Sequence, residues 1–328
     1  MKKIAAFAAV GAAVLAARRY LAMREALADV EPDLRNPALP FVTVTHSATT
    51  LPALRLVYRL RMSPGPGVDV GTRTVGQSAI RALVITPERH RANRPAVLAL
   101  HGGGMVVGSP QLELVTHGRL ARDLGAVVVS PDYRLAPENP FPAALDDCMA
   151  TLQWMSQNAE ELGIDADRIA VVGRSAGGGL AAAVAQRSHD EGFTLRAQGL
   201  MYPMLDDRTV LNDDNEGRGR LVWTPESNRF AWTAYLGREP RRSDAPAYAA
   251  PARRDDLSGL PPAWIGVGDL DLYYGEDVAY AEKLRACGVP CELITVPRMY
   301  HAADGYAPKA RSMETFVESL VNHLKAHL

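Results

Sequence analysis

Cysteine is scarce in this 328-residue chain, which contains only Cys148, Cys287 and Cys291. Three thiols cannot all pair, and none has the spaced cysteine and histidine neighbours of a zinc site. The sequence therefore predicts free thiols, no disulfide framework and no metal. Such usage is typical of a reducing compartment, which makes the cytoplasm the expected location.

An excess of charge of either sign is also absent. The formal net charge is -1 and charged residues make up 22% of the chain, so nothing electrostatic predicts a nucleic acid or an anionic membrane surface as partner. There is no internal repeat and no long low-complexity tract. Because 47% of the residues are hydrophobic, we expect a globular core in one large domain or two small ones.

The N-terminal apolar run is too short for an ordinary bilayer span. It covers the 14 residues Ile4 to Ala17, between a lysine pair and an arginine pair. Its length fits the hydrophobic region of a signal peptide, but the arginines stand where a cleavage site would be expected. We expect residues 1–20 to begin a retained helix, packed or membrane-associated. A cleaved signal or a true anchor, and hence export, is the alternative.

Strand and helix patterns alternate along most of the chain. Apolar runs predict strands at 79–86, 96–100, 126–130, 169–172, 198–202, 263–267 and 292–296, and helical patterns occupy 112–124, 142–162, 177–188, 276–286 and 312–327. Such alternation is typical of parallel strands joined by right-handed helical crossovers, with helices on both faces. The predicted fold class is therefore α/β with a mostly parallel sheet.

Residues 207–255, here called the insert, break this alternation. The segment is first polar and then carries an aromatic cluster of Trp223, Phe230, Trp232 and Tyr235. A loop of that length would be unusual in a compact domain, so we expect an inserted helical element over the sheet's edge. Its aromatic side chains either line a pocket or simply pack the insert.

One turn carries the pattern Gly173-Arg-Ser-Ala-Gly177, between a predicted strand and a predicted helix. In such a sharp turn a Cβ at either glycine would collide with neighbouring backbone, and the middle residue is strained. Ser175 would then present its hydroxyl at a helix N-terminus, where negative charge is favoured. The pattern also occurs by chance in a plain packing turn, but the strand-turn-helix context favours a nucleophile.

A serine nucleophile requires a base and an acid further along the chain. Of the later histidines, His301 follows strand 292–296 in a loop, where a base is expected. Of the others, His189 is predicted to be distant from the serine, and His323 and His327 are predicted to be solvated. Strand 263–267 is followed by Asp269 and Asp271, and either could orient the imidazole.

Backbone donors for an oxyanion are predicted in the glycine loop, His101-Gly102-Gly103-Gly104, which follows strand 96–100. Glycine lets the backbone itself approach a substrate carbonyl. The expected donors are the amides of Gly103, Gly104 and Ala176. A phosphate-binding loop is the alternative, but neither a Walker lysine nor a dinucleotide glycine spacing follows.

Four segments together resemble the hormone-sensitive-lipase-like family of α/β-hydrolase carboxylesterases, which is bacterial family IV. They are His101–Gly104, Pro131–Asp147, Gly173–Gly178 and Gly268–Ala281. The resemblance implies an α/β-hydrolase fold with Asp271 as the acid. It also implies a cap made of residues 1–50 and the insert, over a catalytic core of 51–206 and 256–328. Members of this family hydrolyse esters of short to medium acyl chains without a cofactor.

Two positions depart from that family's pattern. Arg174 stands where aspartate is usual, and Met105 stands where an aromatic residue often follows the glycine loop. Arg174 either points away from the substrate or supplies a cation to His301 or to an acidic substrate group.

We therefore predict a serine carboxylesterase that acts on a small-molecule ester. An amidase, lactonase or deacetylase with the same triad is the alternative, as is a non-catalytic small-molecule binding protein on the same scaffold. Neither the natural substrate nor the oligomeric state follows from the sequence.

Overall fold

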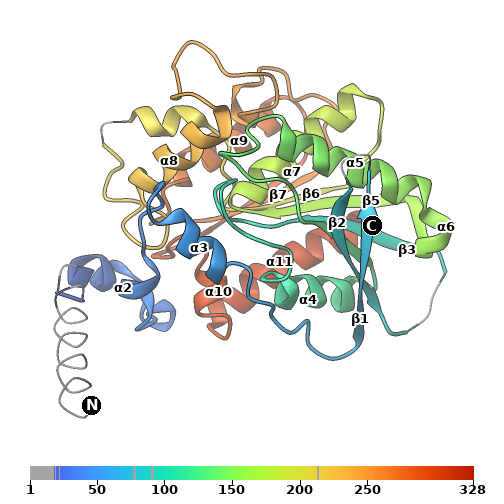
Figure 1. Ribbon diagram of the computed structural model, residues 1–328, viewed down its shortest axis with the longest axis horizontal. Helices are drawn as coiled ribbons and strands as arrows, with labels where there is room; N and C mark the ends of the chain where they lie inside the picture. Colours follow the sequence, from blue (N-terminus) through green and yellow to red (C-terminus); the bar gives the residue numbers. More distant parts are fainter. Residues whose placement is uncertain (1–17, 19, 22, 77–78, 90–91, 213) are drawn as a thin grey trace.

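The computed structural model describes residues 18, 20–21, 23–76, 79–89, 92–212 and 214–328 (Figure 1). The N-terminal run at residues 4–17 lies outside this part of the chain, so its helical structure and its fate stay predictions. Residues 23–29 are helical. Over the described ranges, no helix combines the length and apolarity needed to cross a membrane.

The elements alternate as the sequence predicts. The strands are β1 (Val68–Val75), β2 (Ile80–Pro87), β3 (Arg94–Leu100), β4 (Val127–Pro131), β5 (Ile164–Arg174), β6 (Gln198–Met201), β7 (Ala263–Gly268) and β8 (Cys291–Val296). The longer helices are α3 (Leu51–Val57), α4 (Leu114–Leu124), α5 (Ala143–Gln157), α7 (Ala176–Asp190), α8 (Pro225–Leu236), α9 (Tyr274–Ala286) and α11 (Arg311–His327). The short helical turns are η1 (Pro32–Leu34), α2 (Leu39–Val42), α6 (Ala159–Leu162), η2 (Asp207–Leu211), η3 (Pro251–Arg253) and α10 (Ala303–Tyr306).

The eight strands found among the described residues form one sheet in the order β1-β2-β4-β3-β5-β6-β7-β8. β1 pairs antiparallel with β2, and β2 pairs antiparallel with β4. Every other neighbouring pair is parallel. The prediction of an α/β fold with a mostly parallel sheet is confirmed.

Helices cover both faces of the sheet (Figure 1). α5, α7 and α9 pack with one core cluster, while α4 and α11 pack with another on the opposite face. The central strand β3 alternates between the two clusters, because Ala96 and Leu98 join the first and Val97 and Ala99 join the second. Burial on both sides explains why such strands are nearly continuous apolar runs in the sequence.

Three local features differ from the sequence expectation. β1 was not predicted, because it is a half-exposed edge strand paired on one side only, and its apolar signal is weak. The helix expected over 142–162 is interrupted at Asn158, so α5 ends at Gln157 and α6 continues from Ala159 to Leu162. The carbonyl of Trp154 accepts from both the amide and the side chain of Asn158 at this break. β5 begins at Ile164 rather than Ile169.

The three cysteines all lie within the described residues and are free thiols, as predicted.

The insert is helical, as expected, and α8 is its main element. Thr224 caps α8 by accepting a hydrogen bond from the Ser227 amide, and Gly237 ends the helix with φ +68°. α8 contacts α3 through a small apolar cluster that includes Leu51, Val106 and Phe230. Residues before α3 also contact the insert, because the His46 amide donates to Ser227 Oγ and the Val222 amide donates to Thr43 Oγ1, both over 3.0 Å.

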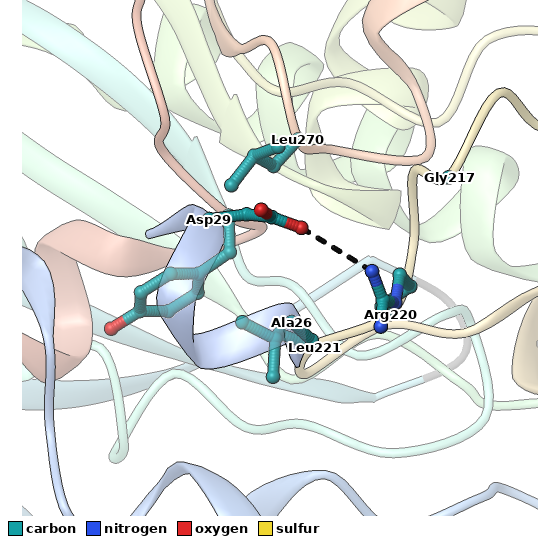
Figure 2. Close-up of a pocket in the computed structure, with 7 residues that line it drawn as sticks. Ala26, Asp29, Gly217, Arg220, Leu221 and Leu270 are labelled. Atoms are coloured by element: carbon teal, nitrogen blue, oxygen red, sulfur yellow. Dashed lines mark hydrogen bonds and ion pairs between the residues drawn. The ribbon is translucent and has the colours of Figure 1, made fainter. Parts of the chain in front are cut away.

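The chain just after the N-terminus also contacts the insert. Figure 2 shows a small pocket in which Ala26 and Asp29 lie beside Arg220 and Leu221 of the insert and beside Leu270, which precedes Asp271. The Asp29 carboxylate and the Arg220 guanidinium are 3.3 Å apart. These contacts hold the N-terminal segment against the loop that follows β7.

The inner face of α9 carries an unusual buried carboxyl group. Asp277 is fully buried, as are Tyr273 and Tyr280 one turn before and after it, and neither of its side-chain oxygens has a hydrogen-bond partner among the described residues. Burial raises the pKa of Asp277 well above its usual value, and the carboxylates of Glu276 and Asp271 raise it further. The folded protein therefore binds the Asp277 proton more tightly than the unfolded chain does, and the free energy of unfolding that comes from this group is largest at low pH.

We predict that Asp277→Asn reduces the dependence of stability on pH. An unfolded aspartate ionises near pH 4, whereas the buried carboxyl keeps its proton to higher pH, so folding stability declines as pH rises above about 4. Thermal unfolding at about pH 5 and about pH 8 should show a smaller drop in Tm for the variant than for the wild type. Asp69→Asn, at an exposed position of β1, is the control. An unchanged drop in Asp277→Asn would contradict the prediction.

Candidate active site

Ser175 lies at the apex of the turn between β5 and α7. Its backbone has φ +54° and ψ -120°, a strained conformation for a residue other than glycine. The Ser175 amide donates to the carbonyl of Met201 over 2.9 Å, and its carbonyl accepts from the amides of Gly179 and Met204, both over 3.0 Å. Backbone bonds to β6 and to the loop after it therefore stabilise the strained turn.

The two glycines of the turn are required by close backbone contacts. A Cβ at Gly173 would lie 1.9 Å from the carbonyl oxygen of Gly177, and one at Gly177 would lie 2.2 Å from that of Leu100. Real Cβ atoms do not approach backbone so closely. The turn consequently lies against the end of β3, where the glycine loop begins.

Side chains from three separate loops meet at this turn. His301 Nε2 lies 2.9 Å from Ser175 Oγ, and His301 Nδ1 lies 2.7 Å from Asp271 Oδ2. With the proton on Nδ1, the imidazole donates to the carboxylate and accepts from the serine hydroxyl. The exposed fractions of Ser175, Asp271 and His301 are 6%, 0% and 4%. In this buried hydrogen-bonded series, the imidazole can deprotonate the serine hydroxyl, and the carboxylate can stabilise the resulting imidazolium.

Of the two aspartates after β7, only Asp271 contacts the imidazole. Its second oxygen accepts a hydrogen bond from the amide of Tyr273 over 3.0 Å. Asp269 instead accepts from the amide of Arg298 over 2.6 Å, and so orders the loop that leads toward His301.

Three aromatic rings surround His301, and of these the sequence offered only Trp223 as a candidate, in the aromatic cluster of the insert. The ring centroids of Tyr202, Tyr273 and Trp223 lie 4.9, 5.4 and 6.2 Å from that of the imidazole. Tyr202 directly follows β6 and Tyr273 directly precedes α9, so a position at the carboxyl end of a strand was the available signal. Trp223 comes from the insert.

The aromatic cluster of the insert divides between the two expected roles. Trp223 lies over the site, since a Cβ at Gly104 would be 2.4 Å from its ring. Trp232 and Tyr235 are buried in the core cluster beneath α8, whereas Phe230 packs toward α3. The insert therefore contributes one aromatic side chain to the site and uses the others for packing.

The glycine loop approaches the serine closely. A Cβ at Gly102 would lie 3.5 Å from Ser175 Cβ, and one at Gly103, where φ is +122°, would lie 2.2 Å from the carbonyl oxygen of Val107. Within the described part of the chain, the amides of Gly103, Gly104 and Ala176 donate no hydrogen bond. The arrangement leaves three backbone donors beside the serine.

His101, at the start of that loop, is held by the protein. Its ring stacks on Tyr133 with 4.0 Å between centroids, and its Nδ1 lies 2.9 Å from the carbonyl oxygen of Gly102. The Tyr133 hydroxyl donates to the His101 carbonyl over 2.7 Å. Burial lowers the pKa of His101, so the ring is neutral and supports the loop. Met105, the second departure from the family pattern, is buried at the end of this loop with φ +63°.

The remaining late histidines lie away from Ser175. His189 is exposed near the end of α7. The expectation that His323 is solvated is wrong, because its side chain is only 7% exposed and its Nδ1 lies 3.8 Å from the Glu292 carboxylate. His327 is half-buried one turn further on.

Arg174 points away from the serine hydroxyl, into a buried group of polar side chains. It pairs with Glu113 and Asp304 and donates to the Tyr202 hydroxyl.

Across the described ranges, no group of three or more histidine, cysteine, aspartate or glutamate side chains is arranged to hold a metal ion.

The geometry and the topology define a hydrolase of the α/β type. The alpha/beta hydrolase fold family matches residues 97–304, which include Ser175, Asp271 and His301. The chain belongs to this family, in the hormone-sensitive-lipase-like branch that the sequence motifs predict.

Named relatives are similar over most of the chain. The carboxylesterase NlhH of Mycobacterium tuberculosis is 36% identical over 292 residues, which cover 85% of this chain and 90% of that protein. The esterase LipI of the same organism is 37% identical over 250 residues, or 74% of this chain and 73% of LipI. Among solved structures, a bacterial heroin esterase superposes with a TM-score of 0.83 at 31% identity, covering 92% of this chain and 99% of that one.

We predict that Gly173→Ala destabilises the protein by about 1 to 3 kcal/mol, because the added methyl group must displace the backbone of α7. Esterase activity per folded molecule should also fall. Gly275→Ala is a matched control, since a Cβ there meets nothing within 4 Å at the exposed start of α9. Its unfolding free energy should change by less than about 0.5 kcal/mol. Equal effects of the two substitutions in urea unfolding would contradict the assigned role of Gly173.

Proposed function

We propose that the chain is a serine carboxylesterase with Ser175 as nucleophile, His301 as general base and acid, and Asp271 as the residue that orients His301. The observation that carries this proposal is the continuous hydrogen-bonded chain from Ser175 Oγ through the imidazole to the Asp271 carboxylate. The ester class is supported by the relatives, whose names are carboxylesterase and esterase.

The proposed reaction begins when Ser175 Oγ attacks the ester carbonyl and its proton passes to His301 Nε2. The tetrahedral intermediate collapses, and the imidazolium returns the proton to the departing alcohol oxygen. An acyl-enzyme remains on Ser175. Water, deprotonated by His301, then attacks the acyl carbon. The bond to Ser175 Oγ breaks, the imidazolium returns the proton to Oγ, and the carboxylic acid leaves. Throughout, the Asp271 carboxylate keeps the Nδ1 proton in place and stabilises the imidazolium.

The amides of Gly103, Gly104 and Ala176 are the proposed oxyanion donors. They are adjacent to the serine and free of internal hydrogen bonds within the described residues, so they can bind the developing negative charge without rearrangement. Ala176 is also the first residue of α7, where the helix dipole favours an anion.

We propose that residues 1–50 and the insert form the cap that selects the substrate. Support comes from hydrogen bonds between the two segments, since the His46 amide donates to Ser227 Oγ and the Val222 amide donates to Thr43 Oγ1, both over 3.0 Å. Trp223 also extends from the insert toward both His301 and Gly104. We propose that this aromatic wall limits the acyl chain to short or medium length, which is the range that the family resemblance implies. Amides, lactones and acetylated small molecules share the reacting carbonyl and are outcomes of the substrate test.

The central test combines labelling with turnover. An alkyl phosphonate should form one covalent adduct, which mass spectrometry of peptides should locate on Ser175. Ser175→Ala and His301→Ala should each lower kcat/KM for nitrophenyl acetate or butyrate by about 10⁴-fold or more, because both groups act in the same step. His189→Ala, which alters an exposed histidine on α7, should keep wild-type rates. Turnover by Ser175→Ala close to the wild-type rate would overturn the proposal.

For residues 1–20 we propose a retained helix that associates with a membrane. The residues that follow it pack on the core, where Ala26 and Val30 are buried, whereas Tyr20 and Leu21 are 58% and 61% exposed. Apolar side chains exposed beside the basic residues of the N-terminus suit the interface of a bilayer.

This proposal predicts that the full chain floats with phosphatidylcholine vesicles in a density gradient and that a chain lacking residues 1–20 stays at the bottom. Esterase activity should be the same in both, since the catalytic groups lie elsewhere. The mass of the protein isolated from cells should include the N-terminal residues. A full chain that does not float would contradict membrane association. If the N-terminal helix instead joins copies of the chain, the full chain should sediment faster than the chain lacking residues 1–20.

A further inference from the structure

Arg174 occupies the position next to the serine and is largely buried, with 15% of its side chain exposed. All three guanidinium nitrogens are used, each by a different partner. Nε donates to the Tyr202 hydroxyl over 2.8 Å, Nη1 to Glu113 over 2.5 Å and Nη2 to Asp304 over 2.9 Å. The Tyr202 hydroxyl in turn donates to Asp304 over 2.6 Å, which closes the network.

The partners of Arg174 come from three separate segments at the carboxyl end of the sheet. Glu113 directly precedes α4, and Tyr202 directly follows β6. Asp304 lies in α10, three residues after His301. One side chain therefore joins the turn that carries the serine to the loop that carries the histidine.

The joined segments hold three residues in strained backbone conformations. The φ angles of Ser175, Tyr202 and Ala302 are +54°, +37° and +60°. Such a conformation is unfavourable for a residue with a side chain and persists only where its surroundings fix it. Arg174 is bonded to Ser175 through the chain, to Tyr202 directly, and to the Ala302 segment through Asp304.

The electrostatics of the network favour the same role. Burial by itself would raise the pKa of Glu113, but the charge and hydrogen bond of Arg174, together with His117 and His101, outweigh it and hold that pKa below its usual value. Glu113 and Asp304 would be two buried carboxylates without a cation if Arg174 were removed, and the loops that carry them would separate or admit water. Because its nitrogens already bind protein groups, Arg174 is not placed to receive an acidic substrate group.

We propose that Arg174 is a positioning residue that keeps the His301 loop within proton-transfer distance of Ser175. It acts through Asp304 and Tyr202, and the Tyr202 ring packs edge-on against the imidazole. The inference rests on the proposed function, since it assumes that His301 exchanges a proton with Ser175.

The test compares kcat and KM of Arg174→Met, Arg174→Lys and Asp304→Asn with wild type, for nitrophenyl butyrate. Active sites are counted by phosphonate titration, so that rates refer to competent molecules only. Arg174→Met should lower kcat about 10- to 100-fold with KM changed less than about threefold, because misplaced catalytic groups slow the chemical step. Arg174→Lys should recover part of the loss, since one ammonium group retains the charge but cannot reach three partners.

A double-substitution cycle separates positioning from general loss of stability. Arg174→Met with Asp304→Asn should be no slower than Arg174→Met alone, because both changes break the same link. Arg187→Met is the control, since it removes two ion pairs from the exposed side of α7, with Asp146 and Glu191, and should leave kcat unchanged. If Arg174→Met does not fold, Arg174→Lys and Asp304→Asn carry the test.

Wild-type kcat in titrated Arg174→Met, or in both Arg174→Lys and Asp304→Asn, would overturn the inference. So would multiplicative losses in the double variant. These outcomes differ from failure of the proposed function, in which Ser175→Ala itself would retain turnover.

Discussion

The close packing of the β5–α7 turn against the end of β3 is the constraint on which the site depends. Gly173 and Gly177 allow backbone atoms to approach to distances that no Cβ would tolerate, and Ser175 takes up the resulting strain. The same approach brings the glycine loop beside the serine, so nucleophile and oxyanion donors are set by one backbone contact. The histidine and the aspartate then need only to be delivered by loops after β8 and β7.

Enclosure of this site comes from parts of the chain outside the sheet. α3 packs on α8, the segment around Asp29 pairs with Arg220, and Trp223 lies over the glycine loop and the imidazole. Trp232 and Tyr235 of α8 are buried in the core cluster, so the insert is anchored on the core while Trp223 extends to the imidazole.

The arginine beside the serine illustrates how a departure from a family pattern is accommodated. A buried cation next to the nucleophile would be costly alone, but Glu113 and Asp304 compensate its charge, and Tyr202 takes the remaining nitrogen. The outcome is a link between two loops rather than a group directed at the substrate. Of the two roles open for Arg174 from the sequence, the structure supports the one in which the side chain turns away from the substrate.

Local pattern determined a large part of this protein: the α/β class, the strand-turn-helix around Ser175, the glycine loop and the loop position of His301 all follow from spacing and periodicity within short windows. β1 was not predicted, because an exposed edge strand has little apolar signal. His323 was wrongly expected to be solvated, because its burial depends on which elements pack against α11. Residue spacing left Asp269 and Asp271 equivalent, and only the folded loop directs one to the imidazole and the other to Arg298. The Arg174 network was likewise decided by tertiary structure, since its partners lie 28 to 130 residues away and no local pattern encodes such contacts.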